Sequence, residues 1–268
     1  MEEHYKLGLV LSGGGTRGVA HAGILKVLLA AGIKPQVLSG ASAGAIISTL
    51  YAGGYSPEEM RDFFKQEDIF DRRKLAFAFP KLGLVDLEAF RELFQAYFPE
   101  DRFEALSHPI YIMTTNLLTG KAEVFSEGEL ITPILASCAV PGIFSPIEID
   151  KAPHGDGGIF SNFPSDPLIG KCEALLGIYV HPLETLDAKS LRNPIDVLSR
   201  AYDISRSAAV HYKFSDCDHV IIPEDIHPYG VFDTDHIDEI FEAGVRAGEA
   251  ALAQIREVLD EKGLRVEG

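Results

Sequence analysis

Residues 7–44 read LGLVLSGGGTRGVAHAGILKVLLAAGIKPQVLSGASAG, and this stretch decides the fold. It opens with a short apolar run, Leu7–Leu11, which is typical of a strand buried on both faces of a parallel sheet. Helical spacing of apolar residues follows over Arg17–Ala31, then a second strand over Pro35–Ser39 and a second helix over Ala43–Ala52. Because strand and helix alternate, the sequence predicts parallel strands joined by right-handed crossovers.

The same alternation continues along the rest of the chain. Further strands are expected at Ile110–Thr114, Lys121–Phe125, Ala174–Val180 and His219–Ile222, and a long amphipathic helix at 234–259. Ser56-Pro57-Glu58-Glu59 has the Ser-x-x-Glu spacing of a capping box, so a helix should begin there. We expect one α/β domain over residues 1–268, a three-layer α/β/α sandwich with a mostly parallel central sheet.

Acidic residues dominate the charge of the chain. Asp and Glu number 40 against 24 Lys and Arg, which gives a formal net charge of −16. No basic run interrupts this excess, so nucleic acid is not an expected partner. No stretch reaches the roughly 18 apolar residues that a transmembrane helix needs, and the first residues resemble neither a signal nor a transit peptide.

The cysteines favour a reducing compartment. Cys138, Cys172 and Cys217 are widely spaced, odd in number and form no CxxC pair. Reduced thiols in a cytoplasmic protein are therefore expected. The chain also lacks HExxH, paired CxxC and calcium-loop motifs, so we expect no metal.

The first glycine-rich segment, residues 13–18, follows a strand, precedes a helix and matches G-x-G-x-x-G. A dinucleotide site would need an acidic residue about 20 positions later, but no Asp or Glu occurs between Glu3 and Glu58. A phosphate loop fails too, because Arg17-Gly18-Val19 stands where Lys-Ser/Thr is required. What remains is a row of N–H groups at a helix N-terminus, which suits a developing oxyanion. A tight turn without ligand and a non-catalytic nucleotide- or anion-binding module are the alternatives.

The second glycine-rich segment, Gly40-Ala41-Ser42-Ala43-Gly44, matches G-x-S-x-G. Its small residues permit the sharp strand-to-helix turn that exposes a serine hydroxyl. Ser42 also lies at the start of a helix, where the positive end of the dipole favours developing negative charge. The pattern therefore indicates a nucleophile.

A serine nucleophile needs a base. In a Ser-His-Asp triad this base is a histidine that follows the acid in the chain, and five histidines fit that order: His181, His211, His219, His227 and His236. None of them lies in a glycine-framed turn. Asp156 does, in Gly155-Asp156-Gly157-Gly158, although such a sequence is often only a turn.

Together these segments resemble the patatin-like phospholipase family. Gly13–Gly18 is similar to its oxyanion loop, Gly40–Gly44 to its G-x-S-x-G elbow, and Asp156–Gly158 to its Asp-Gly-Gly, all in the family's order. Ala136–Pro141 is similar to the Ala-Ser-x-Ala-x-Pro block that precedes the aspartate. One departure is Ser12, which stands where many relatives have Asp.

The resemblance implies a serine acyl-ester hydrolase with a Ser-Asp dyad. Ser42 would attack a phospholipid, lysophospholipid or other fatty-acyl ester, and Asp156 would take its proton. The N–H groups of Gly13, Gly14 and Gly15 would hold the oxyanion, in a loop completed by Arg17 and Gly18. No metal or organic cofactor is implied. The expected partner is a lipid or fatty-acyl ester, with transient contact between a local apolar rim and a membrane surface; a Ser-His-Asp esterase is the rival.

Residues 55–108 are expected to form an aromatic-rich insertion or lid. Nine of the sixteen phenylalanines fall in its central part: Phe63, Phe64, Phe70, Phe77, Phe79, Phe90, Phe94, Phe98 and Phe103. Most of these rings should form a satellite core, and a few could line an acyl pocket or its lid.

Overall fold

The computed structural model describes residues 4–66, 87–183 and 185–264. The strands form one eight-stranded sheet: β1 (Tyr5–Leu11), β2 (Val37–Ala41), β3 (Ile110–Asn116), β4 (Lys121–Phe125), β5 (Ile147–Ile149), β6 (Ala152–Asp156), β7 (Cys172–Ile178) and β8 (His219–Ile221). The α-helices are α1 (Val19–Ala30), α2 (Ala43–Ala52), α3 (Pro57–Lys65), α4 (Arg91–Tyr97), α5 (Ile131–Ser137), α6 (Gly158–Ser161), α7 (Pro194–Val210) and α8 (Ile237–Glu261).

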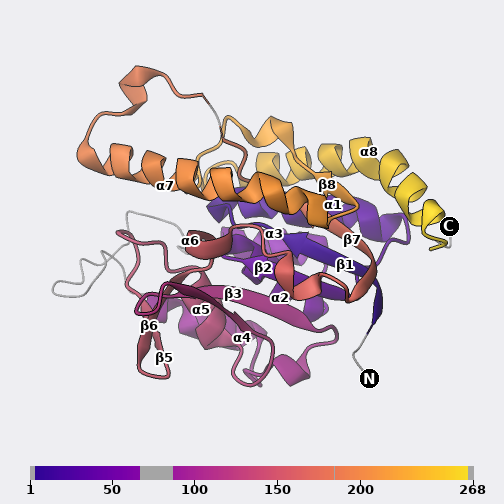
Figure 1. Cartoon of the computed structure of the whole chain (residues 1–268), viewed down its shortest axis with the longest axis horizontal. Helices are drawn as coiled ribbons and strands as arrows, with labels where there is room; N and C mark the ends of the chain where they lie inside the picture. The colour runs from indigo at the N-terminus through magenta and orange to yellow at the C-terminus, as the bar shows by residue number, and fades with distance from the viewer. Residues whose placement is uncertain (1–3, 67–86, 184, 265–268) are drawn as a thin grey trace.

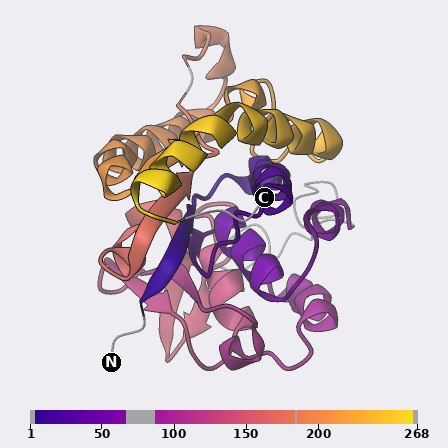
Figure 2. The ribbon, with the colours of Figure 1, turned by 90° about the vertical axis from the view of Figure 1, so that its right-hand side faces the viewer.

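The sheet has a parallel centre and an antiparallel edge. Strands run in the order β5-β6-β3-β2-β1-β7-β8, with β4 also paired to β3. The pairs among β3, β2, β1, β7 and β8 are parallel, whereas β4, β5 and β6 pair antiparallel. Helices lie on both faces (Figure 1), and in Figure 2 the purple helices and the orange α7 flank the strands on opposite sides. The predicted α/β/α sandwich with a mostly parallel central sheet is confirmed.

Burial on both faces explains the continuous apolar run of β1. Leu9 and Val10 are neighbours on this strand, so their side chains point to opposite faces, and both are fully buried. Leu9 belongs to the larger core, whereas Val10 packs in a smaller core with Phe163 and Val210. The strand is therefore covered on both sides, as its sequence predicts.

The helix expected from Arg17 begins later than its apolar spacing suggests. Gly15–Gly18 forms a 3-10 turn, and α1 starts at Val19. Two features delay it: Gly15 has φ +60°, and the N–H of Thr16 donates to the carbonyl of Val231 at 2.9 Å. The glycine loop is thus tied to a segment far along the chain before the helix begins.

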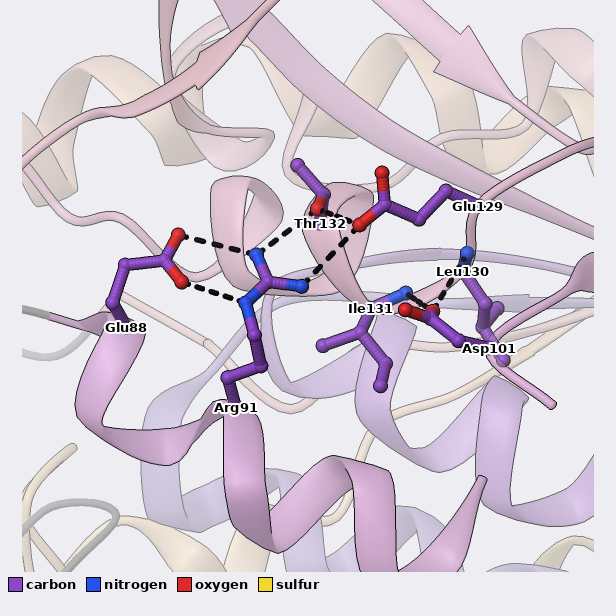
Figure 3. Close-up of polar contacts among 7 residues, drawn as sticks. All are labelled: Glu88, Arg91, Asp101, Glu129, Leu130, Ile131 and Thr132. Carbon is purple, nitrogen blue, oxygen red and sulfur yellow. Dashed lines mark hydrogen bonds and ion pairs between the residues drawn. The ribbon is translucent and has the colours of Figure 1, made fainter. Parts of the chain in front are cut away.

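Helix α5 is held at its N-terminus by Asp101 and Arg91. Asp101 Oδ1 accepts hydrogen bonds from the N–H of Leu130 at 3.2 Å and of Ile131 at 2.7 Å. Arg91 reaches from α4 to the same end of α5. Figure 3 shows the residues of this network: Glu88, Arg91, Asp101, Glu129, Leu130, Ile131 and Thr132. Fixing this end places the other end of α5, at Ser137, beside the end of β2.

The described parts of the 55–108 segment form packed helices. The capping box predicted at Ser56 is present, because Ser56 Oγ accepts from the N–H of Glu59 while Glu59 Oε2 accepts from the N–H of Ser56. Five of the nine phenylalanines are buried: Phe63, Phe64, Phe94, Phe98 and Phe103. Phe90 is partly buried against the same core, and Phe70, Phe77 and Phe79 lie outside the described residues. These rings belong to the main core, not to the separate satellite core that was expected. The lid stays a prediction.

The structure holds no candidate for a membrane-crossing helix within residues 4–66, 87–183 and 185–264. Helix α8 is the longest helix described, and acidic side chains begin its first turn.

Candidate active site

Strand β3 brings the ends of β2 and β6 together. β2 ends with Ala41 opposite Met113, and β6, which runs the other way, ends with Asp156 opposite Thr114. Strand β4 pairs with residues 112–116 of β3, a stretch that overlaps the pairing of β3 with β2 and with β6. β2 and β6 therefore share the other edge of β3 and meet end to end. Ser42 follows β2 directly, and the register therefore places it beside Asp156.

Ser42 has the strained backbone of a sharp strand-to-helix turn. Its φ is 51° and its ψ is −122°, which is a rare conformation for a residue with a side chain. The turn needs a close approach of backbones: a Cβ on Gly44 would lie 2.2 Å from the carbonyl oxygen of Leu11. The small residues of the G-x-S-x-G segment are thus required by the packing of α2 against the end of β1.

The end of α5 forms hydrogen bonds with the backbone of both candidate catalytic residues. Ser137 Oγ accepts a hydrogen bond from the N–H of Ser42 at 2.8 Å and donates to the carbonyl of Met113 at 2.6 Å. Two residues later, the carbonyl of Ala139 accepts from the N–H of Asp156 at 2.9 Å. The Ala136–Pro141 block, which the sequence matched only by resemblance, therefore positions both groups.

The Asp156 carboxyl is fully buried. Its Oδ1 accepts a hydrogen bond from the N–H of Gly158 at 2.6 Å, while Oδ2 accepts none within the described residues. Burial raises the pKa of Asp156, an effect that the positive charge of Arg206, the Gly158 N–H and the Ser42 hydroxyl partly offset. A raised pKa and an unbonded oxygen beside a serine suit a general base.

The glycine loop lies directly against Ser42. A Cβ on Gly13 would be 2.5 Å from Asn162 Oδ1 and 3.1 Å from the Cβ of Ser42, so a side chain there would crowd both residues. The N–H of Gly13 donates to the carbonyl of Asn162 at 3.1 Å, so this N–H has a protein partner in the structure. No hydrogen bond engages the N–H of Gly14 or Gly15 within the described part of the chain.

Arg17 and Gly18 hold the glycine loop against other segments of the chain. Arg17 Nε donates to the carbonyl of Tyr229 at 2.6 Å, and Nη2 donates to that of His227 at 3.3 Å. A Cβ on Gly18 would lie 2.4 Å from the Cβ of Ala43, so this glycine lets the loop pack against the start of α2. Both residues shape the loop through these contacts.

Cys138, which directly follows α5, is buried, and both Ser42 and Asp156 affect the pKa of its thiol. Burial and the charge of Asp156 raise the pKa of this thiol far above its usual range. A thiol that stays protonated is a poor nucleophile. Cys138 therefore belongs to the lining of the site.

The histidines nearest the site bond to groups other than Ser42 and Asp156. His21 Nε2 contacts the carbonyl of Ser12 at 2.9 Å, and burial lowers the pKa of His21 to about 4. His154 Nδ1 lies 2.9 Å from Thr114 Oγ1, and His181 Nε2 lies 3.1 Å from Asp203 Oδ1. Within the described residues no histidine hydrogen-bonds to the serine or the aspartate of the site, so the geometry disfavours the Ser-His-Asp alternative.

Three neighbours of the site were missed from the sequence: Asn162, Tyr202 and Arg206. Tyr202 and Arg206 come from α7, a helix that the sequence analysis did not identify, although Pro194 at its start is a helix-start signal. Asn162 follows the glycine-framed aspartate by six positions. The described residues contain no group of three metal-ligating side chains.

Comparison with known sequences supports one family. The family model described as patatin-like phospholipase matches residues 9–169. The chain is 28% identical over 275 residues to an uncharacterised NTE family protein of Mycobacterium tuberculosis, covering 92% of this chain and 46% of that protein. It is also 30% identical over 166 residues to patatin-like phospholipase domain-containing protein 6 of Mus musculus, covering 60% of this chain and 12% of that protein. The chain thus spans about half the length, or less, of these relatives.

A solved structure has a similar fold. VipD from Legionella pneumophila superposes with a TM-score of 0.57 at 15% sequence identity, covering 94% of this chain and 67% of that one. The likeness concerns the fold, which therefore extends beyond residue 169, where the family model ends.

Proposed function

Since the chain belongs to the patatin-like phospholipase family, we propose that it is a serine acyl-ester hydrolase that acts on lipid esters through Ser42 and Asp156. One observation carries the proposal: Ser42, with its strained backbone, and the buried carboxyl of Asp156 lie together where β2 and β6 end, beside the glycine loop. Oδ2 of that carboxyl has no hydrogen-bond partner among the described residues. Nucleophile, base and oxyanion donors are the groups that acyl transfer requires.

In the proposed cycle, Ser42 Oγ attacks the ester carbonyl while Asp156 Oδ2 takes the serine proton. The N–H groups of Gly14 and Gly15 donate to the oxyanion, and the Gly13 N–H stays with Asn162. Asp156 then returns the proton to the leaving alcohol, and water hydrolyses the acyl ester on Ser42. Neither step calls for a metal or organic cofactor.

We further propose that the outer face of α7 contacts the lipid surface. Seven of the thirteen exposed large apolar side chains among the described residues fall between 183 and 212. Three of them lie on α7, namely Val197, Leu198 and Ile204, and four flank it in the chain, namely Leu183, Leu186, Leu191 and Tyr212. Figure 1 shows the first half of α7 on the same side of the molecule as α6 and β6, which carry the Asp156 end of the site.

The charge of this region supports the same contact. Residues 181–213 hold five basic and four acidic side chains, whereas the whole chain has a net charge of −16. The acidic excess lies elsewhere, so an anionic or zwitterionic lipid surface meets less repulsion here than over the rest of the molecule.

The test is an assay on a panel of fatty-acyl esters with the Ser42→Ala variant beside the wild type. The account expects hydrolysis by the wild type and loss of at least a thousandfold in Ser42→Ala, because no other group forms the acyl ester. Ser107→Ala, which changes an exposed serine, is the matched control and should keep full activity. A folded Ser42→Ala protein with wild-type turnover would contradict the proposal.

A further inference from the structure

We propose that Arg206, on α7, is a positioning residue that holds Asn162 against the glycine loop and keeps a positive charge beside the Asp156 carboxylate. The inference rests on the proposed function, because it concerns the same dyad. It assigns to α7 a part in setting the protonation of the base.

The Arg206 side chain is almost completely buried and makes three polar contacts from its two terminal nitrogens. Nη1 donates to Asn162 Oδ1 at 3.3 Å. Nη2 lies 2.8 Å from His181 Nε2 and donates to Asp203 Oδ1 at 3.3 Å. The guanidinium also stacks 4.8 Å from the centre of the Tyr202 ring, while Nε has no partner within the described residues.

The first consequence is that Arg206 orients Asn162. Because Asn162 Oδ1 accepts from Arg206, its Nδ2 points the other way and donates to the carbonyl of Gly13 at 3.3 Å. The backbone carbonyl of Asn162 also accepts from the Gly13 N–H at 3.1 Å. Asn162 thus binds both polar groups of Gly13, and Arg206 fixes the side chain that makes one of those bonds.

The second consequence is that Arg206 lies next to the base. A Cβ built on Gly158 would be 2.7 Å from Asp156 Oδ1 and 3.1 Å from Arg206 Nη1. Carboxylate and guanidinium therefore face the same small space over Gly158, and a side chain at this position would separate them. The absence of a Cβ is what lets the charges approach.

The other titratable groups near this pair are few. Cys138, after α5, and Tyr202, on α7, face Asp156, and burial raises the pKa of each, so both stay neutral. On the far side of Arg206, burial lowers the pKa of His181, and Asp203 is about one-third exposed. Arg206 is therefore the cation that most favours the ionised form of Asp156.

A purely structural role accounts poorly for this arrangement. A buried guanidinium is costly to desolvate, and a buried ion pair often adds no net stability compared with apolar residues of similar volume. Here the paired carboxylate, Asp203, is partly exposed, and Nε is left unbonded. Stability alone therefore does not explain the buried charge of Arg206, whereas an effect on the ionisation of Asp156 does.

The experiment compares Arg206→Gln, which keeps an amide donor but no charge, with Arg206→Lys, which keeps the charge. Arg256→Met removes an exposed arginine from α8 and is the control. For each folded variant, checked by circular dichroism, two pH profiles are measured: kcat/KM on a short-chain p-nitrophenyl ester and the rate of fluorophosphonate labelling.

In Arg206→Gln the acid limb of both profiles should move up by about one pH unit or more, since an opposite charge at this range lowers a carboxyl pKa by about that amount. Arg206→Lys should keep its acid limb within a few tenths of a unit of wild type.

An unchanged acid limb in Arg206→Gln would overturn the inference, whatever happens to the overall rate. Should that variant fail to fold, Asp203→Asn tests the inference instead. Removing the negative charge of the partly exposed Asp203 should move the acid limb to lower pH. An upward shift or no shift would overturn the inference. Failure of the proposed function would give a different result. Ser42→Ala would then keep hydrolysis and fluorophosphonate labelling, whatever residue stands at position 206.

Discussion

At the scale of single residues, Asp156 is the proposed base, and its environment is unfavourable for a charged carboxylate. Its carboxyl is fully buried, and one of its oxygens accepts no hydrogen bond among the described residues. Burial raises the pKa of Asp156 above the value of an exposed aspartate. A group whose pKa is raised by folding stabilises the protein below its unfolded pKa, and this contribution is lost as the pH rises through the folded pKa.

This pH dependence of stability leads to a prediction for Asp156→Asn. Hydrolysis should fall nearly as far as in Ser42→Ala, because the base is removed. At neutral pH the Tm of the variant should exceed that of the wild type, because the cost of a buried charge is gone. The difference should shrink as the pH falls through the raised pKa of Asp156. Calorimetric scans from pH 7 down to pH 3 check this, and a variant less stable than wild type at pH 7 but not at pH 3 would contradict it.

At the residue level the sequence pointed to two side chains that glycines frame, and their catalytic roles stay predictions. Ser42 and Asp156 each lie in such a frame, and the structure brings the two together. The sequence did not foresee the hydrogen bond from the Gly13 N–H to the carbonyl of Asn162, because the two residues are distant in sequence. Arg206 carries no local signal, since its role comes from its packing against Gly158 and Asn162.

At the scale of elements, α7 is the helix that links the surface proposed to contact lipid to the candidate site. Its exposed face carries Val197 and Leu198, which are 52% and 68% exposed, while its buried face carries Arg206. Apolar residues on two faces blur the helical period, which explains why the pattern of this segment did not single it out. Strands β5 and β6 were missed for another reason: they are short and lie in a glycine- and proline-containing stretch.

The exposed face of α7 yields a prediction for Leu198→Ser. Hydrolysis of phospholipid vesicles should fall at least fivefold, because burying a leucine side chain in a lipid interface is worth about 1.5–3 kcal/mol. Hydrolysis of a monomeric short-chain ester should be unchanged. Ile169→Ser changes another exposed apolar residue outside this segment and serves as control. Equal loss on vesicles and on the monomeric ester would argue against an interfacial role for α7.

At the scale of the whole molecule, the sheet topology creates the site. Ser42 and Asp156 are more than a hundred residues apart in the sequence, and they meet because β3 pairs with both β2 and β6 along one edge. The alternation of strands and helices predicted the parallel centre. It could not predict the end-to-end meeting of two strands, because that depends on register along β3 and on β4 occupying the opposite edge.

The central claim is that Ser42 is a nucleophile activated by Asp156. The most direct measurement is the site and rate of fluorophosphonate labelling, mapped by mass spectrometry in the wild type and in Asp156→Asn. The account predicts a single adduct on Ser42, formed at least a hundredfold more slowly in Asp156→Asn because general-base catalysis contributes about that much. An adduct on another residue, or an undiminished rate in Asp156→Asn together with loss of labelling in a single histidine variant, would contradict it.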